Sequence, residues 1–342
     1  MRRIELKIDV SDAVKLAEEA YIAATVFLPN GTALPERPVV CFAKPGGGFS
    51  RHYYTEKLPG AESPSEVSTS VSQAAWHVAR GWIFVCLDHL GVGESSQHRN
   101  QEALDYGVVT TANQAAEEEI LRRLTTGELA DDFPLVVDAV RIGIGQSMGG
   151  SLTVVQQGRH HWYHGIAVLG FSAVHTHPAA PEAPAVSFPW RTRESSSMES
   201  VVLNAAAVSE HTPDTMLAVN RRLFFHDDLD DGLVSRLLGS PADGQADFPW
   251  RSTTLPLGVI SRCLTPGVIA PEAAAVTVPV LVAMGECDVI ADPKGEPRAY
   301  LSARSVDLFI CPRMGHMHNF ATTRELFWQR IHLWGAWVAT QA

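Results

Sequence analysis

Ser147 has a glycine two residues away on each side, in a sequence pattern that is typical of a catalytic serine. Ser147 lies in Gly-Gln-Ser-Met-Gly (145–149), directly after an apolar run that predicts a strand (Val140–Gly145) and directly before a helical pattern (Gly149–Gln157). A sharp strand-to-helix turn of this kind needs small residues on both sides, and it holds the serine hydroxyl clear of the sheet. The pattern predicts that Ser147 is a nucleophile and that the backbone N–H of Met148 helps to bind an oxyanion.

An acid that could support such a nucleophile follows a later strand pattern. Asp288 comes just past the carboxyl end of the apolar run Val278–Met284, where active sites of open α/β sheets are built. A carboxylate there can orient a histidine and stabilise its charged form. Glu286, Asp292 and Glu296 are nearby alternatives, but Asp288 alone lies at the expected distance past the strand.

A histidine that could act as the base follows the next strand pattern, Val306–Cys311. His316 comes after Gly315 in the loop that follows this run, and His318 lies two residues further on. A histidine in this loop can reach back to the serine and take its proton. We favour His316 and keep His318 as the alternative.

A glycine-rich turn after an earlier strand pattern predicts the rest of the oxyanion site. Glycines at 46–48 follow the run Val39–Ala43, and they allow backbone N–H groups to turn toward a ligand. We expect Gly47 to be the main donor and Gly48 to line the same site, with the N–H of Phe49 as a third candidate. No Lys-Ser/Thr pair follows these glycines, so this is not a phosphate-binding loop.

The elements that must position these groups alternate between strand and helix patterns. This alternation predicts an α/β protein with a mostly parallel central sheet and helices on both faces. The opening runs Ile4–Val10 and Ile22–Leu28 predict an antiparallel pair. Further strands are expected at Trp82–Leu87 and Gly165–Gly170, besides those named above. Further helices are expected at 73–80, 111–124 and 325–339.

The alternation stops between residues 172 and 275. This stretch is too long for a loop in a compact domain, and it contains three helical patterns, at 197–208, 215–225 and 231–238. We therefore expect residues 1–171 and 276–342 to form the core domain and 172–275 to form an inserted, mainly helical cap. Cap aromatic residues are expected to face the serine and bind substrate: Phe188, Trp190, Phe224 and Trp250.

Taken together, the chain resembles the α/β-hydrolase fold superfamily, as a serine hydrolase with an inserted cap. The order Ser, Asp, His matches the triad order of that superfamily. Residues 88–95 (Asp-His-Leu-Gly-Val-Gly-Glu-Ser) also resemble its D-x-x-G-x-G-x-S turn, which implies a structural role for Asp88. The family often has His-Gly at the oxyanion turn, where this chain has Lys44-Pro45. Haloalkane dehalogenases and epoxide hydrolases of this fold use an aspartate at the elbow, whereas position 147 is serine.

The resemblance implies hydrolysis of a carboxylic ester or lactone through an acyl-enzyme. The apolar cap residues and the absence of an arginine cluster favour a small-molecule substrate that is neutral, hydrophobic and fairly bulky. A polyketide-like macrolactone is one candidate. A proline-iminopeptidase-like aminopeptidase, with cap acids holding the substrate amine, and a C–C bond hydrolase are alternatives. A non-catalytic ligand sensor on the same fold is the alternative of another class.

Composition excludes several other classes. The chain has 342 residues, a net charge of −11 and no basic stripe, which argues against a nucleic-acid partner. We expect no membrane span, because no window holds about 20 apolar residues. The N-terminus lacks the pattern of a secretory signal, and the five cysteines show no Cys-x-x-Cys spacing, so we expect reduced thiols and a cytoplasmic location. A homodimer is left open.

We expect no cofactor and no metal for this reaction. The acid-rich run 226–232 (His-Asp-Asp-Leu-Asp-Asp-Gly) suggests a calcium loop, but it lacks the alternating acids and the glutamate at the twelfth position that such a loop requires. We interpret it as a solvated turn of the cap near a helix start. The histidines between 160 and 177 match no metal-ligand spacing.

Overall fold

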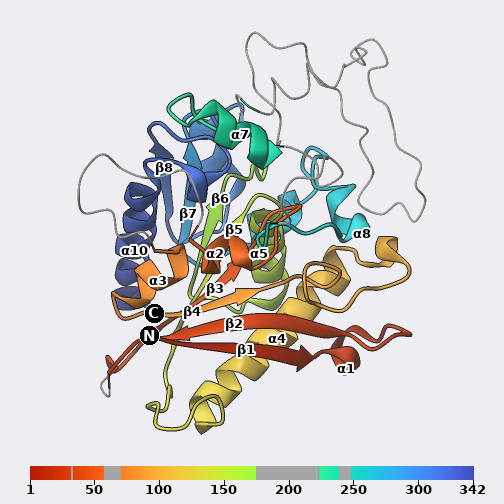
Figure 1. Ribbon diagram of the computed structural model, residues 1–342, viewed down its shortest axis with the longest axis vertical. Coiled ribbons are helices and arrows are strands. Elements are labelled where there is room, and N and C mark those ends of the chain that lie inside the picture. Colours follow the sequence, from red (N-terminus) through yellow and green to blue (C-terminus); the bar gives the residue numbers. More distant parts are fainter. Residues whose placement is uncertain (32–33, 58–70, 175–220, 222–223, 239–247) are drawn as a thin grey trace.

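A single eight-stranded sheet organises the protein. The computed structural model describes residues 1–31, 34–57, 71–174, 221, 224–238 and 248–342 (Figure 1). The strands are β1 (Arg2–Asp9), β2 (Tyr21–Leu28), β3 (Val39–Lys44), β4 (Ile83–Leu87), β5 (Val140–Gln146), β6 (Gly165–Leu169), β7 (Val280–Gly285) and β8 (Val306–Cys311). Their order across the sheet is β1-β2-β4-β3-β5-β6-β7-β8. β1 and β2 are antiparallel to their neighbours, and all the pairs from β4 to β8 are parallel.

Successive residues of a strand point to opposite faces of the sheet, so apolar strands place apolar side chains on both faces. In β3, Val40 and Phe42 pack into one apolar core, whereas Cys41 and Ala43 pack into the other. All four side chains are fully buried. Such continuous apolar strands are typical of a parallel sheet that helices cover on both faces.

The helices divide between these two cores. The α-helices are α1 (Ser11–Val14), α2 (His52–Thr55), α3 (Gln73–Val78), α4 (Tyr106–Thr126), α5 (Met148–His160), α7 (Asp231–Leu238), α8 (Leu257–Ile260), α9 (Ala270–Ala275) and α10 (Arg324–Gln341). The described residues also include the short 3₁₀ helices η1 (Gln101–Ala103), η4 (Pro293–Ala299) and η5 (His318–Phe320). Apolar residues of α4, α5 and α9 belong to one core, and those of α3 and α10 belong to the other. Figure 1 shows α4 and α5 on one side of the sheet and α3 and α10 on the other.

The predicted fold class is confirmed, with small differences at the ends of elements. Helix α4 begins five residues before the predicted Thr111, because Asp105 caps it by accepting a hydrogen bond from the Val108 N–H. Helix α3 is followed by Gly81 at φ +92°, as a left-handed turn after a helix requires. Strand β8 lies at the edge of the sheet, so its residues 306–310 are half-buried rather than fully covered.

The domain division remains a prediction, because much of 172–275 lies outside the described residues. The expected helix at 197–208 lies outside them entirely, and that at 215–225 lies largely outside. The expected helix at 231–238 is α7. All five cysteines are free, and four of them are buried. Within the described part of the chain, no helix is both long enough and apolar enough to cross a membrane.

Candidate active site

The serine predicted as the nucleophile occupies a strained turn between β5 and α5. Ser147 has φ +53° and ψ −123°, a conformation that side-chain-bearing residues rarely adopt. The turn needs both glycines, because a Cβ at Gly145 would lie 2.1 Å from the Gly149 carbonyl oxygen. A Cβ at Gly149 would lie 2.3 Å from the Lys44 carbonyl oxygen. The sequence pattern thus marks a true strand-to-helix elbow, which leaves Ser147 partly exposed.

The acid and both candidate histidines meet at the carboxyl ends of β7 and β8. Asp288 Oδ1 lies 2.6 Å from His316 Nδ1, and Asp288 Oδ2 lies 2.7 Å from His318 Nε2. All three side chains are buried. Sequence reasoning treated the two histidines as alternatives, whereas the structure places both on one carboxylate.

The two histidines differ in where their second ring nitrogen lies. His316 uses Nδ1 for Asp288, so its Nε2 points toward the elbow, 3.4 Å from the side-chain nitrogen of Gln146. The same Gln146 nitrogen donates to the His316 carbonyl at 3.1 Å. His318 uses Nε2 for Asp288, and its Nδ1 is buried with no partner among the described residues, beside the Phe327 ring. This geometry favours His316 as the group that serves Ser147.

The Ser147 hydroxyl and His316 are not hydrogen-bonded to one another in the described part of the chain. The Gln146 side chain lies beside the imidazole instead. Catalytic hydrogen bonds are often long without substrate and tighten in the complex. Gln146 was not singled out from the sequence, although its place inside the elbow motif was the available signal.

The electrostatics keep this carboxylate charged and the second histidine neutral. Burial alone would raise the pKa of Asp288, but the interactions with His316 and His318 outweigh it and leave that pKa well below its ordinary value. Burial lowers the pKa of His318, which the interaction with Asp288 only partly offsets. His318 is therefore a neutral hydrogen-bond donor to an ionised Asp288 at neutral pH.

Asp288, His316 and His318 form one hydrogen-bonded cluster. Asp288, His316 and His318 offer ligand atoms within 4.8 Å of one another. Both oxygens of Asp288 already face an imidazole nitrogen, at 2.6 and 2.7 Å. A carboxylate hydrogen-bonded to an imidazole in this way fixes the tautomer and orientation of the ring.

Gly170, directly after β6, allows the three side chains to come this close. A Cβ at Gly170 would lie 3.0 Å from Asp288 Oδ2, from His316 Nδ1 and from His318 Cε1 alike. Gly170 also has φ +62°, which favours glycine. The acid and the two histidines therefore pack against the backbone at the carboxyl end of β6.

The glycine turn after β3 lies against the elbow, as the oxyanion prediction requires. A Cβ at Gly46 would lie 3.0 Å from Ser147 Cβ, and Gly48 has φ +79°. Among the described residues the N–H groups of Gly47 and Gly48 donate no hydrogen bond, whereas the Phe49 N–H donates to the Gly46 carbonyl at 3.2 Å. Phe49 is thus engaged, which leaves Gly47, Gly48 and the first N–H of α5, on Met148, as the candidate donors.

The far side of this turn is tied to the end of the inserted segment. The Ser50 N–H donates to the Trp250 carbonyl, and the Ser252 N–H donates to the Gly48 carbonyl, both at 2.9 Å. The Trp250 side chain is buried, stacked on Phe248 and packed against the Phe320 ring. Trp250 therefore anchors the glycine turn through its backbone, and its predicted contact with substrate remains a prediction.

The buried Asp88 carboxylate binds the segment that follows the same turn. Asp88 accepts from the Arg51 N–H at 2.6 Å, from Arg51 Nη1 at 2.5 Å and from the Glu94 N–H at 2.9 Å. Arg51 also reaches Glu94 at 2.5 Å and Glu5 at 3.2 Å. Arg51 lies three residues after Gly48, so the structural role implied for Asp88 is to fix the chain that leaves the glycine turn.

Lys44 and Pro45, where the family often has His-Gly, are held by buried polar groups. Lys44 Nζ pairs with Glu117 at 2.6 Å, and it also contacts the Tyr163 hydroxyl; all three side chains are buried. His89 Nε2 lies 3.0 Å from the Pro45 carbonyl. Sequence reasoning missed these partners, because they come from elements far apart in the chain and no local pattern marks them.

Of the predicted cap aromatic residues, Phe224 lies against the site. Its ring centroid is 5.4 Å from that of His316, and its carbonyl accepts from the Met317 N–H at 2.9 Å. Phe224 therefore forms part of the wall beside the candidate base. Phe188 and Trp190 lie outside the described residues.

The alternative acids have other partners. Glu296 accepts from the Ser172 hydroxyl and from the Ala173 N–H, and Asp292 caps η4 through the Gly295 N–H. Glu286 pairs with His226 at 3.2 Å. Among the described residues none of these three acids is hydrogen-bonded to His316, so Asp288 is the carboxylate that the structure places on His316.

Comparison with known proteins identifies the fold. No protein-family model matches the sequence, and no curated protein matches it significantly. A solved proline iminopeptidase from Mycobacterium smegmatis is similar with a TM-score of 0.62 at 14% identity, covering 99% of both chains. A thermophilic esterase from Thermogutta terrifontis has a TM-score of 0.53 at 16% identity, covering 98% of this chain and 99% of its own. A haloalkane dehalogenase variant from Bradyrhizobium elkanii has a TM-score of 0.55 at 12% identity, covering 99% and 98%.

The sheet, the elbow and these similarities define one class of protein, which has the α/β-hydrolase fold. The similar structures carry the names of three different activities, and at such low identity they establish the fold alone. The reaction must be argued from the residues of the site.

Proposed function

We propose that the protein is a serine hydrolase that cleaves a carboxylic ester or lactone through an acyl-enzyme on Ser147. The observation that carries the proposal is the hydrogen-bonded pair of Asp288 and His316, whose Nε2 points toward a strained serine elbow, beside the Gln146 side chain. A nucleophile, an oriented base and unoccupied N–H donors are the parts that acyl transfer needs.

In the proposed mechanism, His316 takes the proton of the Ser147 hydroxyl as its oxygen attacks the substrate carbonyl. The Met148 N–H and the glycine turn bind the oxyanion of the tetrahedral intermediate. His316 then gives the proton to the leaving alcohol, and a water molecule releases the acid by the same steps in reverse order. The ionised Asp288 stabilises the imidazolium in both halves of the reaction.

The substrate that the site favours is neutral, bulky and apolar. The Phe224 ring lies beside the base. Within the described residues no lysine or arginine forms an ion pair or a hydrogen bond with Ser147, Asp288 or His316. These described residues thus offer no cationic partner to a substrate carboxylate or phosphate, which supports a neutral substrate.

Replacement of the serine tests the reaction class. Ser147→Ala is expected to lower turnover of a p-nitrophenyl ester on the order of 10³-fold or more, with the fold intact by circular dichroism. Ser151→Ala is the matched control, because the Ser151 hydroxyl is bonded to the Met148 carbonyl in α5. Near-native activity of Ser147→Ala would disprove the nucleophile assignment.

Chemical labelling separates an enzyme from a ligand sensor on this fold. A serine-reactive fluorophosphonate should attach to Ser147 in the native protein, which peptide mass spectrometry would locate. If Ser147 carried no adduct under native conditions, the sensor alternative would replace the hydrolase proposal.

A substrate panel tests the bond and the size of the pocket. We expect p-nitrophenyl esters with large or aromatic acyl groups, and aromatic lactones, to be cleaved faster than acetyl esters. Preference for amino-acid anilides would favour the aminopeptidase alternative. Preference for acetyl esters would contradict a large apolar pocket.

A further inference from the structure

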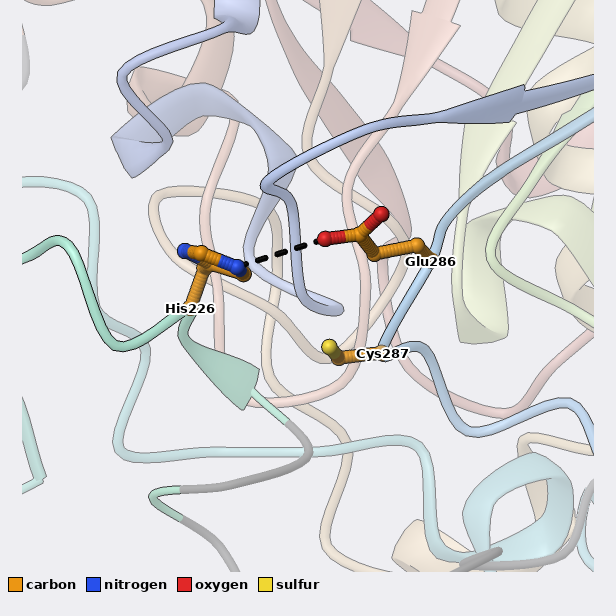
Figure 2. Close-up of side chains that lie close together, drawn as sticks. All are labelled: His226, Glu286 and Cys287. Carbon is orange, nitrogen blue, oxygen red and sulfur yellow. Dashed lines mark ion pairs between the residues drawn. The ribbon is translucent and has the colours of Figure 1, made fainter.

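A second cluster of chemically active side chains lies near the candidate active site but faces the surface. His226, Glu286 and Cys287 place one nitrogen, one oxygen and one sulfur within 4.8 Å of one another (Figure 2). His226 Nε2 lies 3.2 Å from Glu286 Oε1. His226 comes from the segment before α7, whereas Glu286 and Cys287 follow β7, so 60 residues of sequence separate the two parts.

Each member of this cluster is available or already oriented. The other ring nitrogen of His226, Nδ1, lies 3.0 Å from Asp228 Oδ1. Asp228 in turn accepts from the Thr322 hydroxyl at 2.5 Å. The Arg313 N–H holds Glu286 through Oε1 at 2.9 Å.

We propose that His226, Glu286 and Cys287 bind a divalent transition-metal ion of the zinc class. Imidazole nitrogen, carboxylate oxygen and thiolate sulfur are the donors that Zn²⁺ prefers, and three protein ligands leave a fourth position for water. A carboxylate on the remaining nitrogen of a ligating histidine is the usual outer support of such a site. Asp228 supplies that carboxylate.

The geometry needs only a small closing movement. Bond lengths of about 2.0–2.3 Å in a tetrahedral zinc site place ligand atoms roughly 3.3–3.8 Å apart. The three atoms here lie within 4.8 Å of one another, so they must approach by about 1.5 Å at most. Glu286 and Cys287 are not fully buried, and their side chains can make this movement.

A simple ion pair between His226 and Glu286 is the competing explanation, and the thiol distinguishes the two. An ion pair between His226 and Glu286 does not involve the Cys287 sulfur, whereas a zinc site uses such a sulfur as a ligand. Cys287 is the one cysteine of the five that is not fully buried. The chain also contains a surface histidine–glutamate pair without a thiol, His52 and Glu56 at 3.5 Å, which serves as a matched control.

Bound metal would connect two parts of the active-site wall. The segment that carries His226 also carries Phe224, whose ring packs against His316. The loop that carries Cys287 also carries Asp288. The ion would therefore clamp the wall beside the base to the loop of the acid, without touching Ser147.

Cobalt titration of the metal-stripped full-length protein tests the proposal directly. We expect one equivalent of Co²⁺ to produce a thiolate-to-cobalt charge-transfer band together with the visible bands of a tetrahedral ion. The Asp288, His316 and His318 cluster contains no sulfur, so cobalt bound there cannot give the charge-transfer band. Absence of that band at saturating cobalt would overturn the proposal.

Variants identify the ligands. His226→Ala and Cys287→Ser should abolish the charge-transfer band, and Asp228→Asn should weaken cobalt binding by about 10- to 100-fold. His52→Ala should bind cobalt like the parent protein. Retention of the band in His226→Ala, or its loss in His52→Ala, would contradict the assignment.

Thiol protection gives a second readout in the unmodified protein. Zn²⁺ should slow the reaction of Cys287 with a water-soluble disulfide reagent, because the metal holds the sulfur. The protection should persist in Ser147→Ala, which separates this proposal from the proposed reaction. Equal labelling rates with and without Zn²⁺ would overturn the site even if the His226 variant failed to fold.

Discussion

Asp88 and Asp288 lie in similar places but have different partners. Each follows directly or closely on a parallel strand, β4 or β7, and each is buried. Asp88 is bound by the permanently charged Arg51 and by two backbone N–H groups. Asp288 also accepts from two backbone N–H groups, those of Gly285 and Val289, but its side-chain partners are two imidazoles.

The partners decide what each carboxylate can do. Arginine keeps its proton at any working pH, so the Arg51–Asp88 pair can only hold structure. An imidazole exchanges its proton near neutral pH, so the Asp288–His316 pair can take part in proton transfer. A buried aspartate past a strand is therefore not a sign of catalysis by itself, and the identity of its partner is the deciding observation.

The largest expected effect is the loss of activity in Asp288→Asn. The amide cannot hold the His316 tautomer that leaves Nε2 free, so turnover should fall by about 10⁴-fold while substrate affinity changes little. Steady-state kinetics with a p-nitrophenyl ester measure both quantities. Asp292→Asn, an exposed acid near the same loop, should keep the parent rate. An unchanged rate in Asp288→Asn would return attention to Glu286.

Asp88→Asn should instead mainly destabilise the fold. The change leaves the buried Arg51 with only Glu94 and Glu5 as charged partners. Breaking a buried pair costs about 3–5 kcal/mol, and these remaining acids place the expected loss near the lower end, about 3 kcal/mol. Urea unfolding measures it. If Asp88→Asn kept full stability but lost activity as Asp288→Asn does, the division between the two aspartates would be wrong.

Acid should destabilise the folded protein through His89, whose side chain is hydrogen-bonded to the Pro45 carbonyl before the glycine turn. Burial lowers the pKa of His89 from 6.5 to about 4. The unfolded chain therefore takes up a proton as the pH falls below about 6.5, whereas the folded protein does so only near 4. Folding stability is present above pH 6.5 and declines through this window, by at most about 3 kcal/mol from this residue.

The pH dependence of unfolding in His89→Gln checks this contribution. The free energy of unfolding of the variant should change less between pH 4 and 6.5 than that of the parent protein. Parallel pH curves would show that His89 does not contribute.

The smallest expected effect concerns His318, the second imidazole on Asp288. His318→Gln removes a donor to Asp288 Oδ2 but leaves His316 in place. We expect turnover to fall by about tenfold, the lower range seen when an orienting outer partner is lost, with KM unchanged. His316→Gln should fall much further. Equal losses in the two variants would contradict the choice of His316 as the base.

Local patterns predicted the parts of the molecule that are local. The strand alternation, the elbow at Ser147 and the offset of Asp288 past β7 all reside within a few residues of sequence, and the structure shows the geometry that these patterns require. Strict steric demands, such as those at Gly145 and Gly149, leave a readable signal.

Contacts between distant elements left no such signal. Arg51 reaches Asp88 across 37 residues, and His226 reaches Glu286 across 60. Many charged residues of the chain could pair with Arg51 or His226, so only the folded structure shows that their partners are Asp88 and Glu286. The run at 226–232 lacks the sequence pattern of a calcium loop, and only the folded chain places its histidine beside Cys287.

Gly170 carries no functional group, yet a genetic screen for activity should find it among the least tolerant positions of the chain. One added methyl group would press on the acid and on both histidines at once, and the left-handed backbone there already disfavours any side chain. Selection for activity would thus preserve a residue that has no reactive side chain. Conservation at this position would record the packing of Asp288, His316 and His318 rather than any chemistry of Gly170 itself.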